Sequence, residues 1–368
     1  MSSKIRVGFI GCGQIARLHL TQYAKMTNNV EVVALCDISE PCAAQAAKDF
    51  NVGVTYTDYR KLLERDDIDA VDVCLHNNFH RPVTEAALRA GKHVYCEKPM
   101  AGSYRDAAAM LEMSRQTGKK LSIQLSTLYA TETRAAKELI DAGELGELYF
   151  ARSTGFRRRG RPYVDGYGTP TFVQKRNSAG GALYDMGVYH ISQILYLLGN
   201  PKVKRISGKT YQKTDMDAKR RQTSGYDVEE LGIGLVRFDG DITMDLVEAW
   251  AIHLGEFESS YVVGNKGGVK LNPFGFYKSY GNLNIDGTTN LDAAKFRWSN
   301  VQGDWDVYSG SQQHWIAALQ GKVELLPTAQ IALNTMLISE GIYLSNERNA
   351  EVSAEDVEKA SKSSAAQM

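Results

Sequence analysis

The stretch KIRVGFIGCGQIA, residues 4–16, decides the expected fold, because it joins a short apolar strand to a G-x-G-x-x-A turn that opens a helix. Gly11 allows the tight turn, Gly13 lets the backbone approach a pyrophosphate, and the alanine of the motif permits close packing of the helix on the sheet. The helix starts near Gln14 and Ile15 and offers N–H groups and the positive end of its dipole to phosphates. This segment therefore predicts a dinucleotide-binding site.

An acidic residue follows the second expected strand. Val30–Cys36 (VEVVALC) is apolar enough for a strand that is buried on both faces, and Asp37 comes directly after it. An acid about 20–25 residues beyond the glycine turn hydrogen-bonds the ribose hydroxyls, and its charge repels a 2′-phosphate. Residues 38–40 contain no base, so the sequence favours NAD, with NADP less favoured. Arg17 lies near the turn and is a further candidate for phosphate binding.

The arrangement of apolar runs changes along the chain. Strand and helix patterns alternate as far as about residue 125, which predicts a parallel sheet with helices on both faces. Longer β-rich runs with hairpin-like breaks then predict a mostly antiparallel sheet. We expect an α/β Rossmann domain over residues 1–125, an α+β domain with a large, open-faced sheet over residues 126–357, and a frayed tail over residues 358–368.

The composition argues against nucleic-acid and membrane partners. The 368 residues include 43 basic and 43 acidic side chains, so the chain has no net charge to attract a polyanion. The first residues are too polar for a signal peptide, and the chain contains no apolar run long enough to span a bilayer. No metal-ligand spacing or nucleophile motif occurs, so no metal is expected. The five cysteines form no C-x-x-C pair, which indicates reduced thiols and a cytoplasmic location.

Two later segments complete a recognisable set of motifs. The first is LHNNFH at 75–80 followed by AGKHVYCEKP at 90–99, and the second is GGALYDMGVYH at 180–190 followed by LLGNP at 197–201. Together with the glycine turn, these motifs occur in the order found in the glucose–fructose oxidoreductase and inositol dehydrogenase family, often abbreviated Gfo/Idh/MocA. The sequence resembles this family over essentially its whole length.

The resemblance assigns roles to several of these residues. It implies that Lys98 lies beside the substrate and the nicotinamide as the catalytic lysine, and that the peptide bond to the following proline is cis. It also places Leu75, Asn77, His80 and Glu97 around the cofactor. For His80, a structural role as a helix cap is an equal alternative.

The helix that follows Gly180 carries the expected acid/base group. Many relatives have an Asp-x-x-x-His spacing, but here Tyr189 stands four residues after Asp185, and His190 is one residue further. Residues four apart share a face of an α-helix, whereas a residue five apart rotates away. Tyr189 is therefore expected to act with Asp185, ahead of His190. Oxidation of a carbinol needs a group that takes the hydroxyl proton, and the ammonium of Lys98 favours the phenolate of a tyrosine.

A loop rich in arginine, FRRRGRPY at 156–163, is the least generic part of the second domain. Guanidinium groups bind oxygens bidentately and aromatic faces stack on C–H groups, which suits a polyhydroxylated ring. Arg157, Arg159 and Tyr163 are thus expected to bind substrate with Asp185 and Tyr189. A solvated loop or a subunit contact is the alternative.

These observations predict an NAD(H)-dependent oxidoreductase that transfers hydride between the nicotinamide and a secondary carbinol or ketone of a sugar, cyclitol or glycoside. One alternative is a redox-assisted glycoside-cleaving enzyme that retains and recycles its NAD. Another is a non-catalytic dinucleotide-binding sensor, which would need neither Lys98 nor Tyr189. The resemblance also implies a homodimer or homotetramer that forms through the open face of the later sheet, where Ile242–His253 is apolar enough to be buried.

Overall fold

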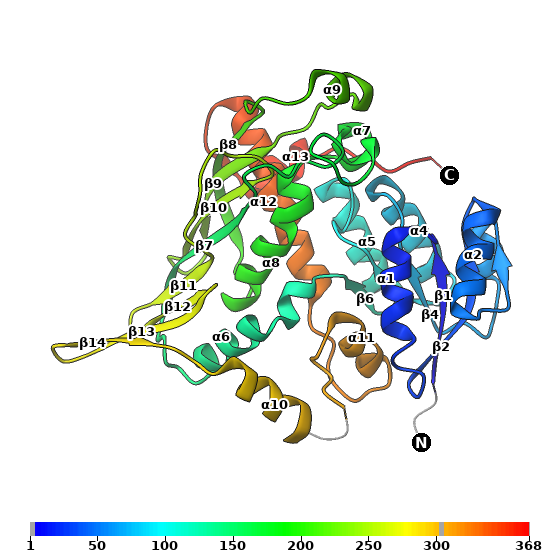
Figure 1. Ribbon diagram of the computed structural model, residues 1–368, viewed down its shortest axis with the longest axis horizontal. Helices are drawn as coiled ribbons and strands as arrows, with labels where there is room; N and C mark the ends of the chain where they lie inside the picture. The colour runs from blue at the N-terminus through cyan, green and yellow to red at the C-terminus, as the bar shows by residue number, and fades with distance from the viewer. Residues whose placement is uncertain (1–3, 302–304, 368) are drawn as a thin grey trace.

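The computed structural model describes residues 4–301 and 305–367. Residues 1–3 of the expected first domain and Met368 of the expected tail lie outside the described residues. Figure 1 shows a strand-and-helix domain on the right and a large second sheet on the left, with long helices between them. Among the described helices, none combines the length and the apolarity that a membrane span requires.

The first domain is a parallel six-stranded sheet in the order β3-β2-β1-β4-β5-β6, which confirms the expected Rossmann fold. Its strands are β1 (Ile5–Ile10), β2 (Val30–Cys36), β3 (Thr55–Tyr56), β4 (Ala70–Val73), β5 (His93–Cys96) and β6 (Leu121–Ile123). Its helices are α1 (Gln14–Tyr23), α2 (Glu40–Phe50), α3 (Tyr59–Leu63), α4 (Asn77–Arg89) and α5 (Tyr104–Thr117). The strand order reverses between β1 and β4, and open α/β sheets bind ligands beyond the carboxyl ends of the strands at such a point.

The second domain contains a nine-stranded sheet in the order β14-β13-β12-β11-β7-β10-β9-β8-β15. All neighbouring strands are antiparallel except β7 and β10, which run parallel, so the expected mostly antiparallel sheet is confirmed. The strands are β7 (Leu148–Phe156), β8 (Val203–Tyr211), β9 (Leu231–Phe238), β10 (Thr243–Ala249), β11 (Tyr261–Gly264), β12 (Gly268–Leu271), β13 (Phe274–Tyr280), β14 (Leu283–Gly287) and β15 (Val352–Ser353).

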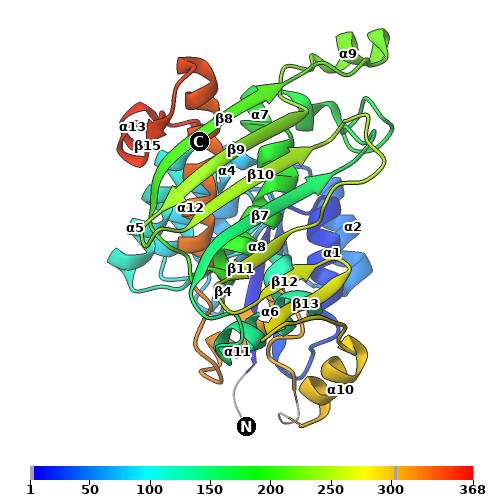
Figure 2. The same cartoon turned by 90° about the vertical axis from the view of Figure 1, so that its left-hand side faces the viewer.

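Within the part of the chain that the structure describes, helices cover one face of this sheet and leave the other open. The long helices α8 (Val188–Leu197) and α12 (Thr328–Arg348) pack behind it, and Figure 2 shows the opposite face uncovered. Burial alternates along β10, where Met244 and Leu246 face the helices and their neighbours are half-buried. The open face carries both apolar and charged side chains, including Leu235 and Arg152. Assembly of the chain through this face stays a prediction.

The remaining helices connect the two sheets and the end of the chain. They are η1 (Ser126–Tyr129), α6 (Thr131–Asp141), η2 (Pro170–Val173), α7 (Lys175–Ser178), the π turn η3 (Leu183–Gly187), α9 (Ala218–Ser224), α10 (Leu291–Val301), α11 (Ser311–Leu319) and α13 (Ala354–Ala360). Helix α11 returns to the first domain, where Trp315 and Ile316 join the core around Phe9 and Leu20. The hydroxyl of Tyr95 also donates to the Ser311 hydroxyl at 2.7 Å. A single cut near residue 125 therefore does not separate the two domains.

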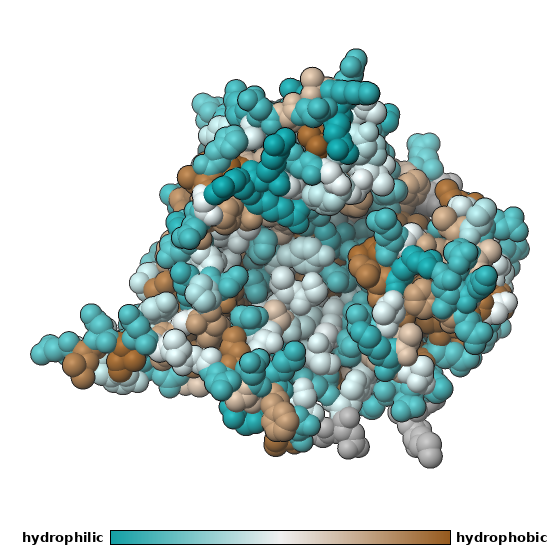
Figure 3. All heavy atoms as spheres, in the orientation of Figure 1, coloured by the Kyte–Doolittle hydropathy of each residue, from teal (hydrophilic) through white to brown (hydrophobic). Residues whose placement is uncertain are grey.

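Several elements depart from the pattern expected from sequence. The sequence pattern did not predict the β13–β14 hairpin or the helices α9 and α10. Most of their side chains are exposed, so these segments lack the periodic burial from which a strand or helix is recognised. The hairpin projects from the body in Figure 1, and Figure 3 shows apolar side chains near its tip, where Leu283 is 68% exposed.

The segment expected to be frayed is held against the first domain. The hydroxyl of Ser363 and the backbone N–H of Ser364 both donate to the carboxylate of Asp106, the latter at 2.8 Å. The N–H of Ala366 donates to the carbonyl of Asn78 at 2.9 Å. The expectation of a frayed tail failed because serine hydroxyls and backbone N–H groups find a buried carboxylate there.

Candidate active site

The glycine turn has the shape that a dinucleotide requires. Gly11 has φ +96°, and a Cβ there would lie 2.2 Å from the carbonyl oxygen of Cys74, so only glycine fits. A Cβ on Gly13 would meet no atom within 4 Å, which leaves open space in front of its backbone. Helix α1 begins at Gln14 without a side-chain cap and without an acid in its first turn, so its N–H groups are available to phosphate oxygens. These residues fit the pyrophosphate of a dinucleotide.

Asp37 directly follows β2, and hydrogen bonds fix the orientation of its side chain. Its carboxylate accepts the backbone N–H groups of Cys12 and Ser39, both at 2.8 Å, which orients it beside the glycine turn. Arg17, considered above as a phosphate ligand, pairs instead with Asp49 on α2. The residues around the expected ribose site therefore combine a fixed carboxylate with an arginine that already has an anionic partner.

The other residues expected around the cofactor have mainly structural contacts. Asn77 donates to the carbonyl of Ser178 at 2.8 Å and so links α4 to the second domain. His80 is fully buried, and its ring lies 2.8 Å from the carbonyl of Pro99 and 3.0 Å from that of Leu75. Burial lowers the pKa of His80, and a neutral ring can donate to only one of these two carbonyls at a time. His80 is not a helix cap, because α4 begins after His76.

Glu97 is also directed into the protein. Its side chain is 5% exposed, and its two oxygens accept from His19 Nε2 and from the backbone N–H of Lys98, each at 2.9 Å. Both oxygens are thus engaged by protein groups, and Glu97 acts on Lys98 rather than lying open to a ligand.

Lys98 and Asp185 join the two domains at the centre of the site. Lys98 Nζ lies 3.0 Å from Asp185 Oδ1 and 4.6 Å from the centre of the Tyr189 ring. The Lys98–Pro99 peptide bond is cis, as the resemblance implied. The fully buried Trp250 donates its indole N–H to Asp185 Oδ2 at 3.0 Å. Both oxygens of Asp185 are therefore fixed.

The protonation of this cluster follows from burial and from its opposite charges. Burial opposes the charge of Lys98, but Asp185, Tyr189 and Glu97 together outweigh it and raise the pKa of the lysine. Burial also opposes the charge of Asp185, yet Lys98 and Trp250 lower the pKa of its carboxyl. For Tyr189, burial raises the pKa and Lys98 only partly opposes it. Lys98 does not make Tyr189 a phenolate in the resting protein, which corrects the simple expectation above.

A π turn brings His190 into the site. Residues Leu183–Gly187 form this wider turn before α8 starts, so positions four and five residues after Asp185 both reach the same cavity. The cavity has a volume of about 450 Å³, and its polar lining includes Arg157, Asp185, Tyr189 and His190. The α-helical argument that His190 rotates away was therefore wrong. A larger, more open hollow of about 590 Å³ lies beside the β13–β14 hairpin, and its lining contains none of the expected site residues.

His190 has a buried acidic partner. Its Nδ1 lies 2.9 Å from Glu248 Oε2, while Ser153 donates to the other oxygen of Glu248 at 3.2 Å. The ring rests on Gly155, where a Cβ would lie 2.1 Å from Nδ1. Burial opposes the charge of His190, but Glu248 outweighs it and raises the pKa of the ring. This arrangement leaves Nε2 as the nitrogen available to the cavity.

The arginine loop contributes Phe156 and one of its arginines to the cavity. Arg157 lines it and is held by the carbonyl of Gly160 at 3.2 Å. Arg159 is 69% exposed and pairs with Asp165, and Tyr163 lies under the guanidinium of Arg220. Neither Arg159 nor Tyr163 lines the cavity, contrary to expectation.

Another arginine of the loop explains why the segment is rich in charge. Arg161 is fully buried and pairs with Asp165 at 2.8 Å and with Glu230 at 2.9 Å. It fixes the loop to Glu230, which directly precedes β9. Sequence reasoning could not separate this structural arginine from Arg157, because all four arginines share one short polar segment.

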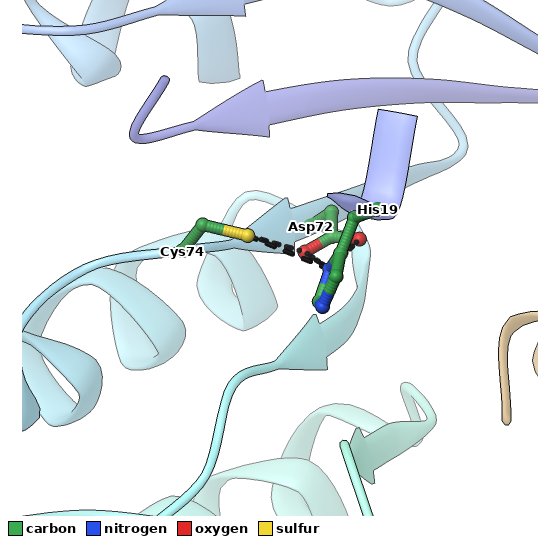
Figure 4. A group of neighbouring side chains, drawn as sticks. All are labelled: His19, Asp72 and Cys74. Carbon is green, nitrogen blue, oxygen red and sulfur yellow. Dashed lines mark hydrogen bonds and ion pairs between the residues drawn. The ribbon is translucent and has the colours of Figure 1, made fainter. Parts of the chain in front are cut away.

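Within the described residues, one group has the composition of a metal site, although no metal was expected from sequence. His19, Asp72 and Cys74 are all buried, and their ligand-type atoms lie within 4.8 Å of one another. Figure 4 shows these three side chains directed toward one another. Hydrogen bonds connect these atoms directly: His19 Nδ1 lies 3.0 Å from Asp72 Oδ2, and Cys74 Sγ donates to Asp72 Oδ1 at 3.2 Å.

The fold and the site define an NAD-binding oxidoreductase. Residues 5–125 match the model of the oxidoreductase family GFO_IDH_MocA, described as an NAD-binding Rossmann fold, and residues 133–270 match the GFO/IDH/MocA C-terminal domain. The chain belongs to this family of oxidoreductases.

Similar proteins include several enzymes that act on sugars and cyclitols. The chain is 29% identical to the D-glucoside 3-dehydrogenase of Escherichia coli K12 over 95% of this chain and 98% of that one. It is 30% identical to the inositol 2-dehydrogenase of Salmonella typhimurium LT2 over 53% of this chain and 54% of that one. Among solved structures, levoglucosan dehydrogenase in complex with NADH and levoglucosan has a TM-score of 0.77 at 18% identity, covering 96% of this chain and 100% of that one. This last likeness shows the shared fold.

Proposed function

We propose that this protein is an NAD-dependent dehydrogenase that oxidises a secondary hydroxyl group of a pyranoside. The observation that carries the proposal is the contact of Lys98 with Asp185 and Tyr189, two residues that line a cavity together with Arg157 and His190. The similarity to a D-glucoside 3-dehydrogenase over nearly the full length of both chains supports a glycoside as the substrate.

The protein's residues manage the proton and the charge of the reacting carbinol. NAD, when bound, accepts the hydride. The ammonium of Lys98 donates to the reacting hydroxyl oxygen and stabilises the negative charge that develops on it. In the resting protein Lys98 and Tyr189 carry one ionisable proton each, because the pKa of each group is raised. The pair must therefore lose one proton before it can accept the hydroxyl proton. Oxidation should accelerate as pH rises through the pKa of this pair.

The rest of the cavity selects a polyhydroxylated ring. His190 Nε2 and the guanidinium of Arg157 supply hydrogen-bond donors for hydroxyl groups away from the reacting carbon. Phe156 and Phe257, whose ring centres lie 5.1 Å apart, present apolar surface to the C–H groups of the sugar. This combination of donors and aromatic surface supports a pyranoside over a small diol.

NAD is the proposed cofactor. Asp37 is held by two backbone N–H groups at the place where the ribose hydroxyls would lie, and its charge disfavours a 2′-phosphate. The pairing of Arg17 with Asp49 further weakens the case for NADP.

A direct assay tests this proposal. Purified protein is mixed with NAD and a panel of glucosides, free aldoses and inositols, and the absorbance of NADH is followed. We expect a rise with glucosides that disappears in Lys98→Ala and falls by about 10²–10⁴-fold in Tyr189→Phe. His190→Gln should mainly raise the KM for the sugar. Full activity in Lys98→Ala would refute the assignment of the site.

The pairing of His190 with Glu248 favours one second candidate, the redox-assisted cleavage of a glycoside. That reaction needs a second acid/base group in the same cavity, and this pair provides one. It yields free aglycone with no net NADH, because the cofactor is oxidised again at the end of each cycle. Measuring aglycone and NADH in the same sample separates the two functions.

A further inference from the structure

We propose that His19 is a positioning residue for Lys98: as an imidazolium clamped between Asp72 and Glu97, it keeps Glu97 ionised and fixed against the catalytic lysine. The effect on activity rests on the proposed dehydrogenase function, whereas the ionisation of His19 is a property of the protein alone. The two can therefore be tested separately.

The geometry of the ring requires two donors. His19 lies on α1, Asp72 on β4 and Glu97 directly after β5. Asp72 Oδ2 lies 3.0 Å from Nδ1 of the ring, and Glu97 Oε1 lies 2.9 Å from Nε2. A neutral imidazole has only one N–H and would direct a nitrogen lone pair at one of the carboxylates. When both carboxylates are ionised, both contacts are favourable only if both nitrogens carry a proton.

Burial makes this pairing strong. The side chains of His19, Asp72 and Glu97 are 2%, 0% and 5% exposed. A buried carboxylate without a partner is very unfavourable, so each acid depends on the shared ring. Burial opposes the charge of His19, but Asp72 outweighs it and raises the pKa of the ring.

The other ionisable groups around the ring stay neutral. They are the Cys74 thiol and the phenols of Tyr23 and Tyr95, and burial raises the pKa of each. Tyr95 packs edge-on against the imidazole, with ring centres 5.6 Å apart. With both carboxylates and the ring ionised, as proposed, the cluster of Asp72, His19 and Glu97 carries one net negative charge. Lys98 directly follows Glu97 in the sequence.

The cluster acts on the active site through Glu97. The second oxygen of Glu97 accepts the backbone N–H of Lys98 at 2.9 Å, and the side chain of Lys98 then reaches Asp185. Charges of alternating sign run from Asp72 through His19, Glu97 and Lys98 to Asp185. Since His19 belongs to α1, this series connects the helix that faces the cofactor phosphates to the lysine that faces the substrate.

Loss of the imidazolium has a defined consequence for the chemistry. Glu97 raises the pKa of both Lys98 and Tyr189 through its charge. Without His19 the buried Glu97 takes up a proton, and that influence disappears. The pKa of the Lys98–Tyr189 pair then falls, and the rise of kcat/KM with pH moves to lower pH. A residue that only supported the fold would leave this profile in place.

Two substitutions of His19 form a matched pair. In His19→Gln the amide nitrogen takes the place of Nε2 and still donates to Glu97, whereas in His19→Asn it takes the place of Nδ1 and donates only to Asp72. We expect His19→Asn to lower kcat by about 10–100-fold, as removal of an outer hydrogen-bond partner does at metal sites, and His19→Gln to lower it far less. The KM for the sugar and the Kd for NAD should change little. Cys74→Ala, which alters the same cluster without touching Glu97, is the control and should leave the pH profile unchanged.

Two further measurements test the proposal even if the His19 variants do not fold. Glu97→Gln should move the pH profile in the same direction as His19→Asn. In the native protein, ¹⁵N NMR of the imidazole nitrogens should show both nitrogens of His19 protonated at pH 8, whether or not a substrate is known. Equal losses of kcat in His19→Asn and His19→Gln with an unmoved pH profile would overturn the proposal. So would an unprotonated nitrogen at pH 8, or stoichiometric zinc that Cys74→Ala releases, because a metal-bound Nδ1 carries no proton.

Discussion

Replacing Lys98 by methionine removes the charge but keeps most of the length of the side chain, and it should make the stability of the fold newly dependent on pH. Lys98 Nζ and Asp185 Oδ1 are 3.0 Å apart, and the two side chains are 14% and 23% exposed. Breaking a buried ion pair by removing one partner costs about 3–5 kcal/mol. Because these side chains keep some exposure, we expect a loss of about 3 kcal/mol in the free energy of unfolding at pH 8.

The dependence on pH follows from the direction of each pKa shift. The pKa of Asp185 is lowered in the fold, so its contribution is present above the ordinary carboxyl pKa and is lost as pH falls through the lowered value. The pKa of Lys98 is raised, so its contribution is present below the ordinary lysine pKa and is lost as pH rises through the raised value. The native pair is therefore fully stabilising between about pH 4 and pH 10. In Lys98→Met, burial raises the pKa of Asp185, and its charged form becomes unfavourable as pH rises.

Urea unfolding at pH 5 and pH 8 measures this effect. The loss of stability in Lys98→Met should be clearly larger at pH 8 than at pH 5. Adding Asp185→Asn to Lys98→Met removes the unpaired carboxylate and should restore about 2 kcal/mol of the free energy of unfolding at pH 8. The single variant Asp185→Asn completes the double-mutant cycle. A loss that is equal at both pH values, or a double variant no more stable than Lys98→Met, would refute the reasoning.

Three further predictions concern the cofactor turn and the support of the site. Gly13→Val should change the melting temperature by no more than about 2 °C but weaken NAD binding more than about tenfold, because the valine side chain fills the open space in front of the phosphates. Gly11→Ala should also destabilise the fold, by about 1–3 kcal/mol, because the Cβ of the alanine meets a backbone carbonyl. Asp37→Ala should weaken NAD binding by about 10–100-fold and reduce the preference of the protein for NAD over NADP. Titrations with both cofactors measure this preference, and an unchanged preference would contradict the assignment of Asp37 to the ribose. Trp250→Phe removes the indole donor to Asp185 and should cost about 1.5–3 kcal/mol in stability together with a fall in kcat; an unchanged kcat would show that the indole does not orient Asp185.

The cofactor turn could be predicted because its requirements are local, whereas the role expected of Lys98 came from the resemblance to the family. A glycine at positive φ and an acid at the end of the next strand each follow from a few consecutive residues. The Rossmann order of the first sheet follows from repeated alternation of strands and helices.

The rest of the cavity could not be predicted because it depends on tertiary contacts. Whether Arg157 or Arg161 enters the cavity depends on the position of Glu230, which lies on a distant segment. The π turn before α8 leaves no recognisable pattern in the sequence. The spacing of a regular α-helix therefore predicted that His190 and Asp185 point apart, although both line one cavity. Exposed elements such as the β13–β14 hairpin lack the burial pattern from which strands are recognised.

The return of α11 to the first domain bears on the order in which this protein can be made. Trp315 and Ile316 complete a core whose other buried residues come from the first hundred positions, and the hydroxyl of Tyr95 donates to that of Ser311. At about 5–20 residues per second, a ribosome needs on the order of 10–40 s to synthesise the stretch between the end of β6 and α11. During that interval the dinucleotide domain emerges with one apolar face uncovered. A transcript truncated after β14 would encode every residue assigned above to the active site and would still yield a first domain with an unfinished core.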